Sequence, residues 1–304
     1  MGEVYPVLSG VLPVFQTPYL GDDSIDVATF EKEIDWLFEQ GSDGIVMAMV
    51  SEILRLDQQE REQLADLAVR FTKGRGSVTI SVGAESTATA VKLTQHAESI
   101  GATALMAIPP VSIAPLEEEL FRYYERIVKA TSLPIVVQDA SGYVGRPMSI
   151  SFQARLMEEF GQDRILFKPE ATPIGPRLSQ LRDATSGRGH IFEGTGGIAL
   201  VDSHRRGIQG TMPGADLIRG IVPLWKALQT GNDQRAYQLS MPISSIVALQ
   251  NSLDAFLAIE KHLLVKQGIF KNTRVRGPVG FTLDSETRDE VDRLFDILIR
   301  AIEA

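Results

Sequence analysis

Short apolar runs recur along the first two thirds of the chain, and a longer segment of helical periodicity follows each of them. The runs are rich in Val, Ile and Leu without a clean apolar–polar alternation, which is typical of strands buried on both faces of a parallel sheet. Eight runs are predicted to be strands, at residues 10–15, 44–48, 78–82, 104–108, 134–138, 165–168, 190–193 and 207–212.

The segments between the strands have one apolar face. Residues 116–128 and 64–71 each place their large apolar side chains at helical spacing. Asp57, followed three residues later by Glu60, predicts a capping box at the start of the second of these helices. Eight strands, each followed by a helix, favour a (β/α)8 TIM barrel in the α/β class. A doubly wound open sheet is the alternative, and it would need fewer strands.

Beyond Met212 the pattern becomes purely helical. Helices are predicted near residues 217–228, 234–251, 255–267 and 285–302. One of them must close the barrel as its eighth helix, and the others form an extension. The predicted division is therefore a barrel over residues 1–230 and a C-terminal helical region over residues 231–304.

Composition narrows the class of protein. The chain has 304 residues, a formal net charge of −9, 44% hydrophobic residues and no cysteine, as expected of a globular protein with a large core. The acidic balance argues against nucleic acid or a membrane surface as partner. Without cysteine there can be no disulfide, thiolate metal site or cysteine nucleophile. No apolar run approaches the ~20 residues that span a bilayer, and residues 1–6 do not resemble a signal peptide, so we expect a cytoplasmic protein.

Lys168 ends the apolar run of residues 165–168, and active sites of (β/α)8 barrels lie at the C-terminal ends of the strands. Burial favours the neutral form of an amine, which can form a Schiff base with a ketone. The alternative is a lysine that emerges into solvent where the strand stops. The other strand ends are small or polar and leave room for a substrate: Gln16-Thr17, residues 49–52, Gly83-Ala84, Pro109-Pro110, Gln138-Asp139, residues 194–196 and Gly210-Thr211.

Several short motifs follow one another along nearly the whole chain: Thr17-Pro18, residues 41–46, Ser51-Glu52, Leu56, Glu60-Arg61, Gly83, residues 97–102, Pro109-Pro110, Phe167-Lys168, residues 207–212 and residues 275–278. In order and spacing they resemble the dihydrodipicolinate synthase / N-acetylneuraminate lyase family. The resemblance implies a (β/α)8 barrel with a helical C-terminal region and Schiff-base chemistry on a small 2-keto acid. It also implies a homo-oligomer, either a tetramer or a dimer, with no metal or organic cofactor.

The chain departs from the family pattern where proton transfer is concerned. Gln138 stands where typical members have the tyrosine that acts as general acid and base, and Val111-Ser112 stand where further tyrosines are often found. Residues 48–52 differ from the family's Gly-Thr-Thr-Gly-Glu. Residues 137–140, together with Ser51-Glu52 and the Phe-Lys-x-Glu spacing, are similar to a sub-branch of 2-keto-3-deoxy sugar acid dehydratases that act on substrates such as L-2-keto-3-deoxyarabonate.

These residues predict a mechanism. Lys168 attacks the C2 ketone, the imine makes a C3 proton acidic, and the enamine expels a C4 hydroxyl or takes part in aldol chemistry. Because an amide is no acid or base near neutrality, we expect dehydration rather than aldol chemistry. The expected catalytic residues are Lys168, Glu170 and Gln138, and Glu52, the Ser51 hydroxyl or a water are further candidates for proton transfer. The expected substrate-binding residues are Met49, Val50, Ser51, Glu52, Asp139, Gly194 and Gly196, with backbone N–H groups around Val50 and Ser51 holding the carboxylate.

Three other functions stay open at this point: a pyruvate-dependent aldolase or synthase, a barrel that binds a keto acid without turnover, and a nicotinamide-dependent oxidoreductase. The last would rest on residues 194–199, which fit a loose Gly-x-Gly-x-x-Ala outside the first βαβ unit where a dinucleotide fingerprint belongs. A tight turn beside the substrate is the preferred interpretation. The four histidines match no metal-ligand spacing, and Tyr143 is expected to cover the mouth of the barrel or to act as a substitute acid.

Overall fold

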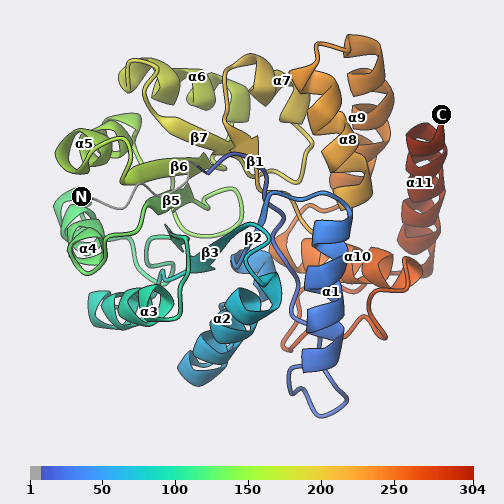
Figure 1. Ribbon diagram of the computed structural model, residues 1–304, viewed down its shortest axis with the longest axis horizontal. Coiled ribbons are helices and arrows are strands. Elements are labelled where there is room, and N and C mark those ends of the chain that lie inside the picture. Colours follow the sequence, from blue (N-terminus) through green and yellow to red (C-terminus); the bar gives the residue numbers. More distant parts are fainter. Residues whose placement is uncertain (1–7) are drawn as a thin grey trace.

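The computed structural model describes residues 8–304, so the residues on which the signal-peptide expectation rests lie outside the described part. Within it, eight parallel strands form one sheet in the order β1-β8-β7-β6-β5-β4-β3-β2 (Figure 1). The strands are β1 Gly10–Val11, β2 Gly44–Val46, β3 Ser77–Ser81, β4 Ala104–Ala107, β5 Ile135–Asp139, β6 Ile165–Pro169, β7 His190–Glu193 and β8 Gly210–Thr211. A parallel bridge between Val14 and Val46 joins the first strand segment to β2 and closes the barrel.

The predicted (β/α)8 barrel is confirmed, although its first and last strands are shorter than expected. The predicted strand at residues 10–15 is interrupted at Pro13, which has no N–H to donate to a neighbouring strand. The carbonyl of Pro13 still accepts from the Val46 N–H at 2.9 Å, so the segment keeps the direction of a strand. At the other end, Gly207 adopts φ +91° and belongs to the turn that precedes β8.

Helices follow the strands and cover the outside of the barrel (Figure 1). They are α1 Val27–Glu39, α2 Gln58–Thr72, α3 Thr87–Ser99, α4 Glu117–Lys129, α5 Ile150–Phe160, α6 Ile174–Ala184, α7 Leu200–Arg205 and α8 Ile218–Gln229. The predicted capping box of α2 is present: Asp57 accepts from the Glu60 N–H at 2.8 Å, and Glu60 accepts from the Asp57 N–H at 2.9 Å. Two orphan donors at the helix start are thereby satisfied.

Three helices continue beyond the barrel: α9 Asp233–Val247, α10 Leu253–Lys266 and α11 Ser285–Glu303. Helices α9 and α11 pack against each other and against α8, while α10 contacts the short 3₁₀ helix η1 (Met49–Ser51) that follows β2. The extension therefore reaches the C-terminal end of the barrel, where the strand ends lie. None of the helices among residues 8–304 is both long and apolar enough to cross a membrane.

The apolar core has two parts that the sheet separates. A large cluster lies between the strands and the surrounding helices. A smaller cluster fills the inside of the barrel and includes Val46, Val136, Leu166, Phe192 and Met212, each from a different strand or strand end. The next inward-facing residues along each strand pack directly above this inner apolar layer.

Candidate active site

The pleat of the strands brings the predicted catalytic residues together. Side chains alternate along a strand, so a residue two positions beyond an inward-facing one also points inward. Leu166 belongs to the inner cluster, and Lys168 follows it by two residues; Val136 and Gln138 stand in the same relation. Gln138 and Lys168 are register partners on neighbouring strands β5 and β6. Both side chains therefore lie above the inner apolar cluster, at the C-terminal end of the barrel.

Lys168 and Glu170 form a buried pair. The Lys168 Nζ lies 3.3 Å from Glu170 Oε1, and the two side chains are 4% and 2% exposed. Gln138 Nε2 donates to the other carboxylate oxygen, Glu170 Oε2, at 2.6 Å. Burial raises the pKa of Glu170, although the Lys168 charge and the Gln138 hydrogen bond act in the opposite direction. A buried carboxyl group with a raised pKa, next to an amine, is a candidate for proton transfer.

Gly194 makes room for this pair. A Cβ atom at Gly194 would lie 2.3 Å from Lys168 Cε and 2.8 Å from Glu170 Oε1. Both distances are far below van der Waals contact, so a side chain at this position would displace the amine. The end of β7 thus needs glycine because the lysine chain crosses it.

A pocket opens around Lys168, and most of the predicted site residues line it. Met49, Val50, Gln138, Glu170, Gly194 and Gly196 are among the lining residues. Tyr143 also lines the pocket, where its ring packs edge-on against Phe256 at a centroid distance of 5.4 Å. Burial raises the pKa of Tyr143, and the charges of nearby carboxylates add to the effect. The phenol therefore stays protonated and is available as a hydrogen-bond donor.

Three residues that the sequence singled out for the substrate make contacts outside the pocket lining. The Ser51 hydroxyl donates to the Phe15 carbonyl at 2.6 Å, and its N–H donates to the Ala48 carbonyl at 3.0 Å. Asp139 accepts from the Met148 N–H at 3.0 Å and holds the loop after β5. Glu52, in the left-handed region at φ +59°, forms an ion pair with Lys261. These contacts support the walls of the pocket, and a direct role toward substrate stays a prediction for all three.

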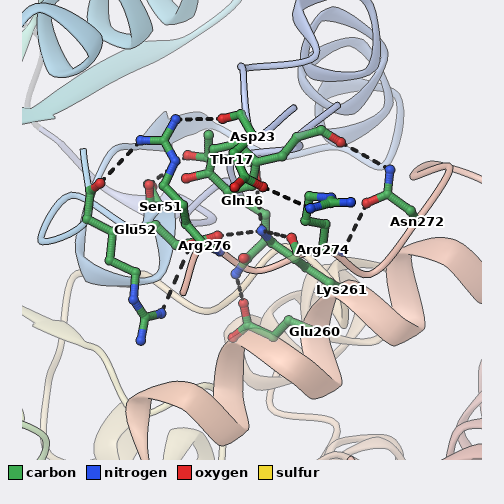
Figure 2. Close-up of polar contacts among 12 residues, drawn as sticks. Gln16, Thr17, Asp23, Ser51, Glu52, Glu260, Lys261, Asn272, Arg274 and Arg276 are labelled. Carbon is green, nitrogen blue, oxygen red and sulfur yellow. Dashed lines mark hydrogen bonds and ion pairs between the residues drawn. The ribbon is translucent and has the colours of Figure 1, made fainter. Parts of the chain in front are cut away.

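Helix α10 supplies two buried charged residues that the sequence analysis missed. The Glu260 carboxyl group lines the pocket and accepts a hydrogen bond from the side chain of Gln16 (Figure 2). Lys261 donates to Glu52, to the Thr17 carbonyl at 2.8 Å and to a third acceptor, the carbonyl of Arg274 (Figure 2). A signal was present: residues 255–264 are apolar apart from three consecutive residues, Glu260, Lys261 and His262. Charged side chains are almost never fully buried unless they are paired, so burial of this run would require partners for these residues.

The chain was compared with known proteins. The model of the dihydrodipicolinate synthetase family matches residues 7–298. This chain belongs to that family. Members of the family are lyases, which assigns the chain to the same class of enzyme. Among residues 8–304 there is no group of three or more acidic or histidine side chains that could hold a metal ion.

Individual relatives are distant. The chain is 28% identical to L-2-keto-3-deoxyarabonate dehydratase of Azospirillum brasilense over 290 residues, which cover 93% of this chain and 92% of the relative. It is 26% identical to 4-hydroxy-tetrahydrodipicolinate synthase of Bartonella bacilliformis over 291 residues, or 94% of this chain and 96% of the relative. The fold matches dihydrodipicolinate synthase from Rhodopseudomonas palustris with a TM-score of 0.87 at 24% identity, covering 96% and 98% of the two chains. A prophage protein from E. coli K12, solved in complex with pyruvate, matches with a TM-score of 0.89 at 22% identity, covering 97% and 99%.

Proposed function

We propose that this lyase dehydrates a 2-keto-3-deoxy sugar acid through a Schiff base on Lys168. The observation that carries the proposal is the buried Lys168–Glu170 pair with Gln138 hydrogen-bonded to the carboxylate. The amine is the nucleophile toward the C2 ketone. Glu170 lies next to it and is the base for the C3 proton that the imine makes acidic.

Gln138 favours elimination over aldol chemistry. Cleavage or formation of a carbon–carbon bond requires proton transfer at a hydroxyl or aldehyde oxygen. An amide side chain cannot act as the acid or base for that transfer. In this site the amide instead orients Glu170, while the Gln138 Oε1 atom is buried without a hydrogen-bond partner among the described residues. That oxygen is free to accept a hydrogen bond from a water or a substrate hydroxyl. The similarity to a sugar acid dehydratase across 93% of the chain agrees with this assignment.

Borohydride trapping tests the imine. The protein is incubated with borohydride and each of a panel of 2-keto-3-deoxy acids and pyruvate, and the digested protein is mapped by mass. We expect the reduced ligand on the peptide that contains Lys168, with loss of activity. Lys168→Ala should abolish both, whereas Lys129→Ala, which removes an exposed lysine, should change neither. Labelling at a different lysine would refute the assignment.

Turnover measurements separate dehydration from the alternatives. The expected reaction is loss of one water from a 2-keto-3-deoxy sugar acid, with weak or no condensation of pyruvate with aldehydes. Glu170→Gln should slow product formation by about 100-fold or more, typical of a lost acid–base group, while the borohydride-trapped imine still forms. Robust pyruvate condensation or cleavage with the sugar acids inert would favour the synthase or aldolase. An imine without turnover of any compound would favour a binding barrel.

A further inference from the structure

Glu260 is a second carboxyl group in the catalytic pocket, and the reaction steps above do not use it. Its side chain comes from α10, outside the barrel strands, and the residue is 1% exposed. It lines the same pocket as Lys168 and Glu170. The hydrogen bond from the Gln16 amide fixes one of its oxygens (Figure 2). The pocket thus holds one carboxyl from the end of β6 and another from the C-terminal extension.

The surroundings of Glu260 are acidic. A Cβ atom placed on Gly214 would lie 2.3 Å from Glu260 Oε1 and 3.0 Å from Asp216 Oδ1, so both carboxyl groups converge on this glycine. Asp216 Oδ2 and Glu33 Oε2 are buried without a hydrogen-bond partner among residues 8–304. The adjacent cation, Lys261, is turned toward Glu52 and two carbonyl oxygens. Glu33 accepts from the backbone N–H of Gln16, the residue whose side chain donates to Glu260. Three buried carboxyl groups therefore lie near one another.

These surroundings favour the protonated form of Glu260. Burial and the neighbouring Asp216 raise the pKa of Glu260 well above its usual value, and Glu33 adds to the effect, while Gln16 and Lys168 oppose it. Burial also raises the pKa of Asp216 to about 7. Burial raises the pKa of Glu170 too, but Lys168 Nζ at 3.3 Å and the Gln138 amide at 2.6 Å act against it. Two carboxyl groups whose environments differ in this way can serve as acid and base in one site.

We propose that Glu260 is the general acid that gives its proton to the departing C4 hydroxyl, while Glu170 takes the proton from C3. The inference rests on the proposed dehydration and deepens it. The C3–H bond breaks and its proton moves to Glu170, leaving the enamine. The enamine electrons then form the C3=C4 bond as the C4–O bond breaks, and the oxygen takes the Glu260 proton and leaves as water. One proton must return from Glu170 to Glu260 before the next turnover.

Glu260→Gln tests the acid directly, since the amide keeps the size of the side chain but cannot donate a proton to a leaving group. Borohydride trapping at Lys168 should stay at the wild-type level, which also shows that the site is folded. Elimination of water should fall by about 100-fold or more, within the range for a lost general acid. Glu98→Gln is the matched control, because the Glu98 carboxylate also accepts hydrogen bonds but lies on the outer helix α3, and it should leave the rate unchanged.

A substrate analogue distinguishes an acid from a residue that only positions the substrate. A 4-fluoro analogue expels fluoride, which needs little proton assistance, so Glu260→Gln should process it at close to the wild-type rate. The wild-type rate of water loss should fall as pH rises and Glu260 ionises, and the variant should lack that limb. Asp216→Asn should move the limb to lower pH, because it removes a neighbouring negative charge.

Several outcomes would overturn the inference. They are water loss by Glu260→Gln at the wild-type rate, equal slowing of the fluoro analogue, and failure of the variant to form the imine. A failure of the proposed function looks different, since it appears in the wild type. If the unmodified enzyme eliminates no water from any 2-keto-3-deoxy acid, the dehydratase proposal fails, and the role of Glu260 as acid to a C4 hydroxyl falls with it.

Discussion

At the scale of single residues, Gly194 controls whether the Lys168 amine can reach its position. A methyl group there would lie 2.3 Å from Lys168 Cε. We therefore predict that Gly194→Ala lowers borohydride-trapped imine by at least tenfold while the protein still folds. Gly21→Ala is the matched control, since a Cβ at Gly21 would have no atom within 4 Å. Mass mapping of both variants measures the effect, and a fully reactive Gly194→Ala would show that the lysine chain can adopt another path.

Glu33 makes a residue-scale prediction about pH. Burial raises the pKa of Glu33 well above its ordinary value, against the effect of the Gln16 N–H, which donates to it at 2.9 Å. In the unfolded chain a glutamate ionises near pH ~4.3. The contribution of neutral Glu33 to the free energy of unfolding is therefore fully present below that pH. It is lost as pH rises through the folded-state pKa, because the unfolded chain ionises first.

Glu33→Gln should remove this pH-dependent loss of stability. Glutamine keeps an oxygen that can accept from the Gln16 N–H, and it cannot ionise. The difference in Tm between variant and wild type should therefore increase in favour of the variant between pH 5 and pH 8. Thermal unfolding followed by circular dichroism measures it. A difference that stays constant over this range would mean that Glu33 does not change its protonation on unfolding.

At the scale of elements, the ion pair between Lys261 and Glu52 ties α10 to the segment after β2. Both side chains are 0% exposed. Removing one partner of a buried pair leaves an uncompensated charge, which costs about 3–5 kcal/mol. Lys261→Met should lower the free energy of unfolding by that amount in urea titrations.

Two further variants make the ion-pair measurement decisive. Glu52→Gln in the Lys261→Met background should restore part of the stability, because it removes the buried charge left behind. Lys129→Met breaks an ion pair with Glu125 on α4 in which the lysine is 65% exposed, and it should cost under about 1 kcal/mol. If Lys261→Met costs no more than Lys129→Met, the buried pair does not hold the extension in place.

At the scale of the whole molecule, the C-terminal extension and the barrel share one pocket. Leu253, Phe256 and Glu260 of α10 line it together with Lys168 of β6. Residue 231, where the predicted helical region begins, lies between α8 and α9. A division at that residue would separate the amine from Glu260, so we expect the two regions to act as one catalytic unit.

Assembly is the remaining whole-molecule prediction. Leu116, the N-cap of α4, is 78% exposed, and Met241 on α9 is 65% exposed. Helices α4 and α9 lie on opposite sides of the barrel (Figure 1). Soluble homo-oligomers usually form closed symmetric assemblies, and these two residues offer positions at which to test an interface. Light scattering should return two or four times the 33.3 kDa chain mass. Leu116→Asp or Met241→Asp should lower that mass, and a monomer at every concentration would contradict the prediction.

The sequence by itself determined the barrel and the central part of its site. Strand runs and helical periodicity are local patterns, and both survive in the structure. Lys168, Glu170 and Gln138 could be found because they stand at strand ends, and parallel strands bring their ends to one edge of the barrel. The apolar pattern made the strand at residues 10–15 too long. It counts Pro13 as an apolar position, although Pro13 lacks the N–H that a continuous strand would donate.

Only the tertiary structure decided what surrounds these residues. Glu260 enters the site, and Lys261 pairs with Glu52 beside it, from a helix far along the chain; no periodicity encodes which strand ends that helix crosses. The path of α10 also turns Glu52 toward Lys261, outside the pocket lining. The need for glycine at residue 194 arises because a Cβ there would lie 2.3 Å from Lys168 Cε on the neighbouring strand. Local patterns specify which face of an element is buried, whereas the partner it meets there depends on long-range packing.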